Sequence, residues 1–258
     1  MRTIDLKGKT ALVMGVANQR SLAWAVATSL SKAGARLAFT YQGERLQENV
    51  TALAMKLPGS LVMACDVMSE EQMDGVFGQV RREFGKLDIL IHAIAFARRD
   101  ELDGEFRKTS REGWKIALDV SAYSLVALTN RAARLMDKDG GSVVALSFLG
   151  SQRVFPNYNV MGAAKAALEQ NVRHLAYELG PQNIRVNCIS AGPVPTLSAR
   201  GISGFNTLAS HHRKFAPLGR NIEPQEVGDT ALFLCSPLAS GITGSILYVD
   251  AGYHIMGY

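Results

Sequence analysis

The chain has 258 residues, of which 47% are hydrophobic and 20% are charged, and its formal net charge is +5. This balance is typical of a folded globular protein and excludes an intrinsically disordered chain. The basic residues are scattered and no apolar run approaches the roughly 18 residues of a membrane span, so we expect neither nucleic-acid binding nor membrane insertion.

Short apolar runs alternate with longer amphipathic segments along the chain. Seven runs are predicted to be strands: Thr10–Met14, Arg36–Thr40, Leu61–Cys65, Asp88–Ile94, Ser142–Ser147, Ile184–Ser190 and Ile246–Val249. Helical patterns between them include Ser21–Lys32, Ser69–Phe84, Trp114–Leu135, Met161–Leu179 and Pro224–Leu234. Nearly continuous apolar strands are typical of parallel sheets covered on both faces. The predicted fold class is α/β, a doubly wound, Rossmann-type, seven-stranded parallel sheet in the order 3-2-1-4-5-6-7 with helices on both faces.

We expect residues 1–258 to form a single domain, because no linker, low-complexity tract or short internal repeat divides them. Residues 196–217 fit the pattern least well, since glycines and scattered apolar residues follow the sixth strand. An excursion past the C-terminal end of a parallel strand lies where such sheets bind their ligands. We therefore predict a substrate-binding lid near residues 196–217.

Three widely spaced cysteines, Cys65, Cys188 and Cys235, each lie in an apolar run. Their odd number and their spacing fit neither a disulfide framework nor a zinc site. The first residues also lack the apolar stretch of a signal peptide. We expect reduced core thiols, no bound metal and a cytoplasmic protein.

The turn after the first strand contains Gly15 and, six residues later, Ser21. Glycine permits a tight turn, and a serine before a helix can cap its first N–H groups. The N–H groups and dipole of that helix suit a pyrophosphate. Because two of the three glycines of the usual dinucleotide fingerprint are missing, a purely structural turn with a capping serine is an equal alternative on this motif alone.

Gln42 follows the second strand, where an acidic residue often binds the ribose hydroxyls of NAD. A glutamine can also bind them, and no basic pair follows directly to hold a 2′-phosphate, although Arg45 lies three residues on. These residues favour NADH over NADPH. Asp66 and Val67 close the third strand within reach of an adenine edge, and a helix-capping role for Asp66 is an equal interpretation.

Tyr158 and Lys165 are seven residues apart, so a helix that begins near Tyr158 places them on one face two turns apart. A lysine near a tyrosine favours the phenolate and lowers a tyrosine pKa that is otherwise about 10. Such a hydroxyl is a better hydrogen-bond donor to a developing oxyanion. The alternative is a tyrosine and a lysine that share a helix by chance.

From its first strand to its last, the chain resembles the short-chain dehydrogenases/reductases. Ordinary members carry Tyr-x-x-x-Lys, whereas this chain has Met161 at the position of that tyrosine and Tyr158 three residues earlier. The Tyr-x6-Lys spacing, within residues 156–165, is similar to the divergent enoyl-[acyl-carrier-protein] reductases. Further stretches agree with that family at residues 14–16, 18–21, 92–97, 190–193 and 236–244.

The resemblance implies reduction of a trans-2-enoyl thioester carried by acyl carrier protein, the last step of the type II fatty acid elongation cycle. Hydride would pass from NADH to C3, and Tyr158 would stabilise the enolate, with Lys165 as its catalytic partner. The residues implied to bind NADH/NAD are Gly15, Ser21, Leu22, Gln42, Asp66, Val67, Ile94, Lys165, Val194 and Thr196. The family also implies a homotetramer.

The substrate would contact Ala97 and Phe148, the latter in place of a second tyrosine that many relatives carry. That hydroxyl is absent here, although a phenyl ring can still pack against an acyl chain. Met161 and Phe205 lie near the active-site helix and in the lid, where lining the acyl tunnel and packing in the core are equal alternatives. Pro195 also departs from the family, which often has a polar or basic residue there.

Three histidines are not assigned to catalysis. His92 lies among apolar residues and is predicted to be a hydrogen-bonded core histidine. His211 and His212 are adjacent, so on a helix they point in different directions and make a poor metal pair. An acidic acyl carrier protein would be attracted by basic residues near the portal, for which Arg200, Arg213 and Lys214 are the weak candidates.

Two other functions stay open. A short-chain alcohol or ketone dehydrogenase is disfavoured by the missing Tyr-x-x-x-Lys and by Phe148 at the usual serine position. A non-catalytic NAD(H)-sensing Rossmann module is disfavoured because Tyr158 and Lys165 are both present. Oxidation of secondary alcohols would support the first alternative, and NADH binding without turnover would support the second.

Overall fold

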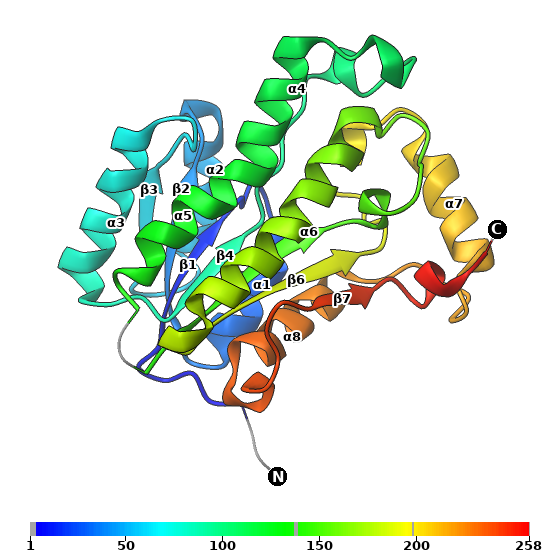
Figure 1. The fold of residues 1–258 in the computed structure, drawn as a ribbon. Coiled ribbons are helices and arrows are strands. Elements are labelled where there is room, and N and C mark those ends of the chain that lie inside the picture. The colour runs from blue at the N-terminus through cyan, green and yellow to red at the C-terminus, as the bar shows by residue number, and fades with distance from the viewer. Residues whose placement is uncertain (1–3, 137–138, 198, 258) are drawn as a thin grey trace.

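The computed structural model describes residues 4–136, 139–197 and 199–257, which contain one seven-stranded sheet (Figure 1). Its order is β3-β2-β1-β4-β5-β6-β7, and all neighbouring strands are parallel, which confirms the predicted topology. The strands are β1 (Thr10–Met14), β2 (Arg36–Tyr41), β3 (Leu61–Ala64), β4 (Ile89–His92), β5 (Gly141–Ser147), β6 (Ile184–Ala191) and β7 (Ile246–Val249). The largest difference from the prediction is at β4, which ends at His92 rather than Ile94.

Eight α-helices lie in the described ranges: α1 (Leu22–Lys32), α2 (Glu44–Ala54), α3 (Glu70–Phe84), α4 (Arg111–Leu118), α5 (Ser124–Ala133), α6 (Asn159–Leu179), α7 (Phe205–Phe215) and α8 (Pro224–Cys235). Helices α2 and α7 are not among the segments named from the sequence. Helix α2 buries only three residues and α7 buries only His212, so neither has a wide apolar stripe. None of the described helices has the length and apolar character needed to cross a bilayer.

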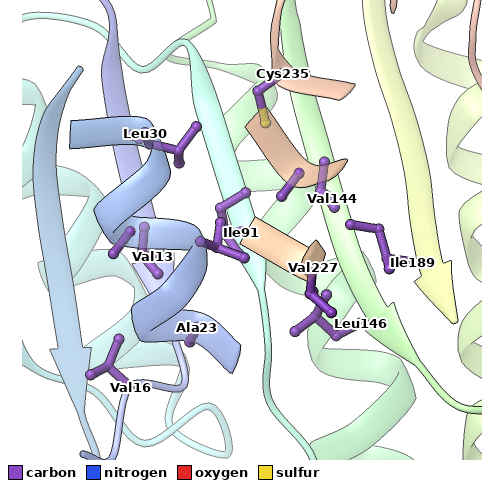
Figure 2. Packing of buried hydrophobic residues seen from close by; sticks show 14 of the residues in the cluster. Val13, Val16, Ala23, Leu30, Ile91, Val144, Leu146, Ile189, Val227 and Cys235 are labelled. Carbon is purple, nitrogen blue, oxygen red and sulfur yellow. The ribbon is translucent and has the colours of Figure 1, made fainter. Parts of the chain in front are cut away.

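Two hydrophobic layers cover the sheet. Helices α1, α2 and α8 cover one face, and α3, α5 and α6 cover the other. Figure 2 shows the first layer, in which Leu30 of α1 and Val227 of α8 lie over Ile91 and Leu146 of the central strands. Helices α1 and α8 approach closely at Gly228, where an added Cβ would lie 2.7 Å from the carbonyl oxygen of Ala25.

The predicted helix over Trp114–Leu135 is confirmed, since the chain is helical from Arg111 to Ala133, but a π-helical turn, Asp119–Tyr123, that the sequence did not indicate joins α4 to α5. Its Ser121 hydroxyl accepts a hydrogen bond from the Phe96 N–H at 3.0 Å and donates one to the Phe96 carbonyl at 3.1 Å. π-turns often mark functional sites because they re-aim side chains. This turn fixes the loop that follows β4, which forms part of the candidate site.

Candidate active site

A cavity of about 390 Å³ lies at the C-terminal ends of β1, β4, β5 and β6, where ligands of such sheets bind. The structure brings most of the predicted site residues to its wall: Gly15, Ser21, Leu22, Ala97, Phe148, Tyr158, Met161, Lys165, Val194, Thr196 and Phe205. Gln42, Asp66, Val67 and Ile94 lie outside this wall. The predicted groups therefore divide between a central cavity, the region beside β2 and β3, and the loop after β4 that contains Ile94.

The turn after β1 crosses directly over the loop after β4. Gly15 has φ +99°, and an added Cβ would lie 2.1 Å from the carbonyl oxygen of Ala93. The site therefore requires glycine both for its backbone conformation and for the close approach of the two loops.

Ser21 precedes α1, but its predicted role as a side-chain cap is wrong. Its hydroxyl points back into the turn, where it accepts hydrogen bonds from the N–H groups of Ala17 and Asn18, each at 3.2 Å, and donates to the Asn18 carbonyl. No side chain caps α1. The N-terminal turn of α1 therefore faces the cavity, through Ser21, Leu22 and Ala23, with donors available for an anion.

The residues after β2 and β3 are linked to each other. The Gln42 side-chain amide donates to Asp66 Oδ2 at 3.2 Å, while Asp66 Oδ1 accepts from the Met68 N–H at 2.9 Å. The helix-capping interpretation of Asp66 is wrong, because Ser69 is the N-cap of α3 and accepts from the Gln72 N–H. Val67 and Ile94 pack in or against the core layer of α3, α5 and α6.

Tyr158 immediately precedes α6, and Lys165 lies two turns into that helix. The two side chains are only 8% and 6% exposed, respectively. The Lys165 ammonium donates one hydrogen bond to the Leu146 carbonyl at the end of β5, at 2.7 Å. An ammonium has three donors, so this contact anchors Lys165 and leaves two N–H groups for a ligand in the cavity.

The expectation that Lys165 lowers the pKa of Tyr158 is wrong. Burial raises the pKa of Tyr158, and the negative charge of Glu169 raises it further. The Tyr158 hydroxyl therefore keeps its proton and is available as a neutral donor. Burial lowers the pKa of Lys165 to about 8, against the opposing effects of Cys188 and Glu169.

An apolar cluster covers one side of Tyr158. The Phe148 ring lies edge-on to the Tyr158 ring at 5.1 Å between centroids, and it also contacts Phe155 at 4.8 Å. Met161 is buried in this cluster and also lines the cavity. It therefore both packs in the core and lies where an acyl chain could contact it. This wall suits an apolar chain next to the Tyr158 hydroxyl.

Residues 196–217 contribute a second wall. Thr196, Leu197, Ala199, Gly201, Ile202, Phe205 and Leu208 all line the cavity. The segment is tied to the loop before α6 by the Asn157 side chain, which donates to the Ser203 carbonyl at 2.9 Å. Residues 196–217 therefore lie where a lid over the cavity would lie. That this segment opens and closes stays a prediction.

The histidines occupy the places expected from the sequence. His92 is completely buried with its Nε2 2.8 Å from the Ser124 hydroxyl, and burial and the Lys165 charge lower its pKa to about 3. His211 is exposed while its neighbour His212 is buried. The side chain of Arg200 lies outside the described part of the structure.

Sequence reasoning missed several residues that complete the site. Leu102 packs with Tyr158 and Met161, and Ser121 holds the Phe96 backbone. Glu169, one turn after Lys165 on α6, accepts hydrogen bonds from Ser147 and Ser151. The spacing of Glu169, four residues after Lys165, is the only sequence signal that pointed to one of them.

The charge of the residues that line the cavity can be compared with the negative charge of a dinucleotide. Among the described lining residues, the charged side chains are Arg99 and Lys165, both cationic. Together with the uncapped start of α1, they provide donors and positive charge for a diphosphate. The residues present therefore fit NADH.

A larger cavity of about 610 Å³ lies on the other side of Phe148 and Leu208, which line both spaces. Its described wall includes Arg153, His211 and Tyr253, but neither Tyr158 nor Lys165. We therefore assign the chemistry to the smaller cavity.

Replacing Gly15 by alanine is expected to weaken NADH binding at least tenfold and to lower the melting temperature. The new methyl group would meet the Ala93 carbonyl, in addition to a backbone strain of about 1–3 kcal/mol. Gly85→Ala is the matched control, since Gly85 has φ +78° with no atom within 4 Å of an added Cβ. Equal losses of NADH affinity in both variants would contradict a specific role of the Gly15 turn.

Comparisons with known proteins agree on one family. A family model described as enoyl-(acyl carrier protein) reductase matches residues 15–254. The Bacillus cereus enoyl-[acyl-carrier-protein] reductase [NADH] FabI is 52% identical, covering 98% of this chain and 99% of that protein. The Staphylococcus aureus (strain MRSA252) enoyl-[acyl-carrier-protein] reductase [NADPH] FabI is 47% identical, and the match covers 97% of this chain and 98% of that protein.

Two solved structures are similar over the whole chain. The Bacillus cereus enoyl-acyl carrier protein reductase with NADP+ and indole naphthyridinone is 51% identical with a TM-score of 0.96, covering 99% of this chain and 100% of that one. The NADH enzyme from Aquifex aeolicus VF5 is 48% identical with a TM-score of 0.95, covering 98% and 99%. The likeness therefore extends through both the cofactor turn and the Tyr158–Lys165 helix.

Proposed function

Because this chain belongs to the enoyl-[acyl-carrier-protein] reductase family, we propose that its central cavity holds NADH beside a trans-2-enoyl thioester of acyl carrier protein. The reaction yields the saturated acyl thioester, in the last step of the type II fatty acid elongation cycle. The observation that carries the proposal is the presence of Tyr158 and Lys165 in one cavity with an uncapped helix start and an apolar wall.

When bound, NADH supplies the hydride that adds to C3 of the enoyl group. Tyr158 donates its hydroxyl hydrogen bond to the thioester oxygen, where negative charge grows. Lys165 holds the nicotinamide ribose with the donors that its Leu146 contact leaves available. Gly15, Ser21 and Leu22 bind the diphosphate, while Val194 and Thr196 bind the carboxamide end. C2 of the resulting enolate then takes up a proton.

The substrate lies against Ala97, Phe148, Met161 and Phe205. Their apolar surface excludes water from the thioester, which strengthens the hydrogen bond from Tyr158. The Phe148 ring supports the Tyr158 ring but brings no hydroxyl of its own. Catalysis therefore depends on the single tyrosine hydroxyl, with the lid at residues 196–217 closing over the acyl chain.

The test is the loss of NADH absorbance with a trans-2-enoyl thioester such as crotonyl-CoA or crotonyl-acyl carrier protein. We expect steady turnover that requires both NADH and the enoyl double bond. Tight NADH binding without turnover would contradict the proposal and favour a sensor module. Reduction of ketones in preference to enoyl thioesters would favour a short-chain alcohol or ketone dehydrogenase.

We expect NADH to bind more tightly than NADPH, because Asp66 orients Gln42. A carboxylate only accepts hydrogen bonds, so Gln42 turns its NH2 group to Asp66 and leaves Oε1 to accept from a ribose hydroxyl. A 2′-phosphate has no donor for that oxygen. Asp66→Asn would let the amide reverse, and the preference for NADH should narrow about tenfold, or about 1.4 kcal/mol.

Titration of NADH and NADPH binding measures this ratio in the wild type and in Asp66→Asn. Glu48→Gln is the control, because it removes the same charge from an exposed position of α2. An unchanged ratio in Asp66→Asn would show that the Gln42 orientation does not set the preference.

The partner in this proposal is acyl carrier protein, and the exposed Arg213 and Lys214 at the end of α7 provide positive charge within the lid segment. We further propose a cytoplasmic homotetramer. It is supported by the exposed aromatic residues Trp114 of α4, Tyr123 of the π-turn and Tyr177 of α6. Light scattering should give four times the chain mass, and a monomer would contradict the tetramer.

A further inference from the structure

Glu169 is a buried carboxylate that lies one turn after Lys165 on α6 and is only 3% exposed. Its Oε1 accepts hydrogen bonds from the hydroxyls of Ser147 at 2.7 Å and Ser151 at 2.6 Å. Burial of a charged group is costly unless the group is hydrogen-bonded. Both hydrogen bonds come from one short turn at the end of β5, so Glu169 joins this turn to the active-site helix.

The turn between these two serines packs against the Tyr158 ring. Phe148 in the turn lies edge-on to the Tyr158 ring. Gly150 also lies directly against the Tyr158 ring, because an added Cβ there would lie 2.6 Å from Cδ1 of Tyr158. A shift of the turn would therefore move the Tyr158 ring and its hydroxyl.

Glu169 also acts on Lys165 through its charge. The ionisable groups that act on Lys165 are Cys188 on β6, Glu169 on α6 and His92 on β4. Burial raises the pKa of the Cys188 thiol to about 12 and lowers the pKa of His92 to about 3, so both are neutral while Lys165 titrates. Tyr158, whose pKa is raised, is neutral as well. The Glu169 carboxylate is then the negative charge that favours the Lys165 ammonium.

We propose that Glu169 is a positioning residue for both catalytic groups: it holds the Ser147–Ser151 turn against the Tyr158 ring and keeps the Lys165 ammonium charged. This proposal rests on the proposed function, since it takes Tyr158 and Lys165 as the catalytic pair. Glu169 itself is absent from the described cavity wall, so it acts through these two residues.

Two sets of variants separate the two effects. Glu169→Gln keeps the shape and an acceptor oxygen but removes the charge, while Ser151→Ala removes one hydrogen bond and leaves the Glu169 carboxylate bonded to Ser147. Glu178→Gln is the matched control, because it is the same substitution at an exposed position of the same helix. NADH binding is titrated by fluorescence from pH 6 to 10, and kcat is measured with crotonyl-CoA.

For Glu169→Gln, we expect the pH at which NADH binding weakens to fall by about one unit below that of the wild type. Ser151→Ala should keep the wild-type pH midpoint, because Ser147 still donates to the carboxylate, but should lose about tenfold in kcat, since the Tyr158 hydroxyl is misplaced. Glu178→Gln should change neither quantity. Loss of thermal stability alone would move none of these midpoints.

An unchanged midpoint in Glu169→Gln, together with unchanged kcat in Ser151→Ala, would overturn the proposal. If Glu169→Gln does not fold, Glu169→Asp retains the charge on a shorter side chain, and it should keep the midpoint while lowering kcat. A shifted midpoint in Glu169→Asp would then contradict the proposal. If the wild type binds NADH but reduces no enoyl thioester, the proposed function fails, and the binding titration still tests the effect on Lys165.

Discussion

Replacing Tyr158 by phenylalanine is expected to lower kcat for a trans-2-enoyl thioester by at least about 100-fold, the loss typical of a removed oxyanion donor. NADH affinity should stay within about twofold, because the lost interaction forms mainly in the transition state. The phenyl ring keeps its edge-on contact with Phe148, so the wall of the cavity persists. Steady-state rates and NADH titration measure the two quantities.

Two controls make the Tyr158→Phe result specific. The variant should melt close to the wild-type temperature, since the Tyr158 hydroxyl has no hydrogen-bond partner among the described residues and burial of the ring is retained. Tyr177→Phe, at an exposed position of α6, should keep the wild-type kcat. Wild-type kcat in Tyr158→Phe would mean that another group stabilises the thioester oxygen.

The raised pKa of Tyr158 changes the interpretation of the pH profile. A group whose pKa is raised keeps its proton to higher pH, so Tyr158 stays a neutral donor throughout the neutral range. A loss of activity just above neutral pH therefore has to come from another group. Lys165, with its pKa lowered to about 8, is that group.

The strand pattern could be predicted because it depends on local sequence. Strand β1 is buried at every residue and β4 likewise, so their continuous apolar runs mark parallel strands with helices on both sides. The resemblance to one enzyme family also placed Tyr158 and Lys165 together, and both line one cavity. Both the strands and the Tyr158–Lys165 pair could be predicted because each depends on residues that are close in sequence.

The errors arise where residues distant in sequence meet. Ser121 on an unexpected π-turn bonds to Phe96 from 25 residues away. The Ser21 error is the exception, because its hydroxyl bonds to Ala17 and Asn18 in its own turn rather than to α1. The pKa of Tyr158 depends on burial and on Glu169 rather than on the lysine that shares its motif. Helix spacing can place a lysine near a tyrosine, but it cannot give the depth at which either is buried.

The affinity for NADH is expected to weaken as pH rises above about 8, because the Lys165 pKa is lowered to about 8 and only its ammonium form carries charge. Below that pH the lysine is protonated, and in the proposed function its ammonium donates to the ribose. Above it, each pH unit should weaken binding about tenfold, until the contribution of the charge is exhausted. NADH fluorescence titrations from pH 6.5 to 10 measure the slope.

Lys165→Met should remove this pH dependence, because a buried thioether neither titrates nor donates. At pH 7 the variant should bind NADH about 10- to 100-fold more weakly than the wild type, the range of about 1.5–3 kcal/mol for a hydrogen bond from a charged donor. At pH 10, where the wild-type lysine has lost its proton, the two affinities should converge. Equal slopes in the wild type and Lys165→Met would assign the titration to another group, whereas convergence above pH 8 follows only if the Lys165 ammonium holds the cofactor.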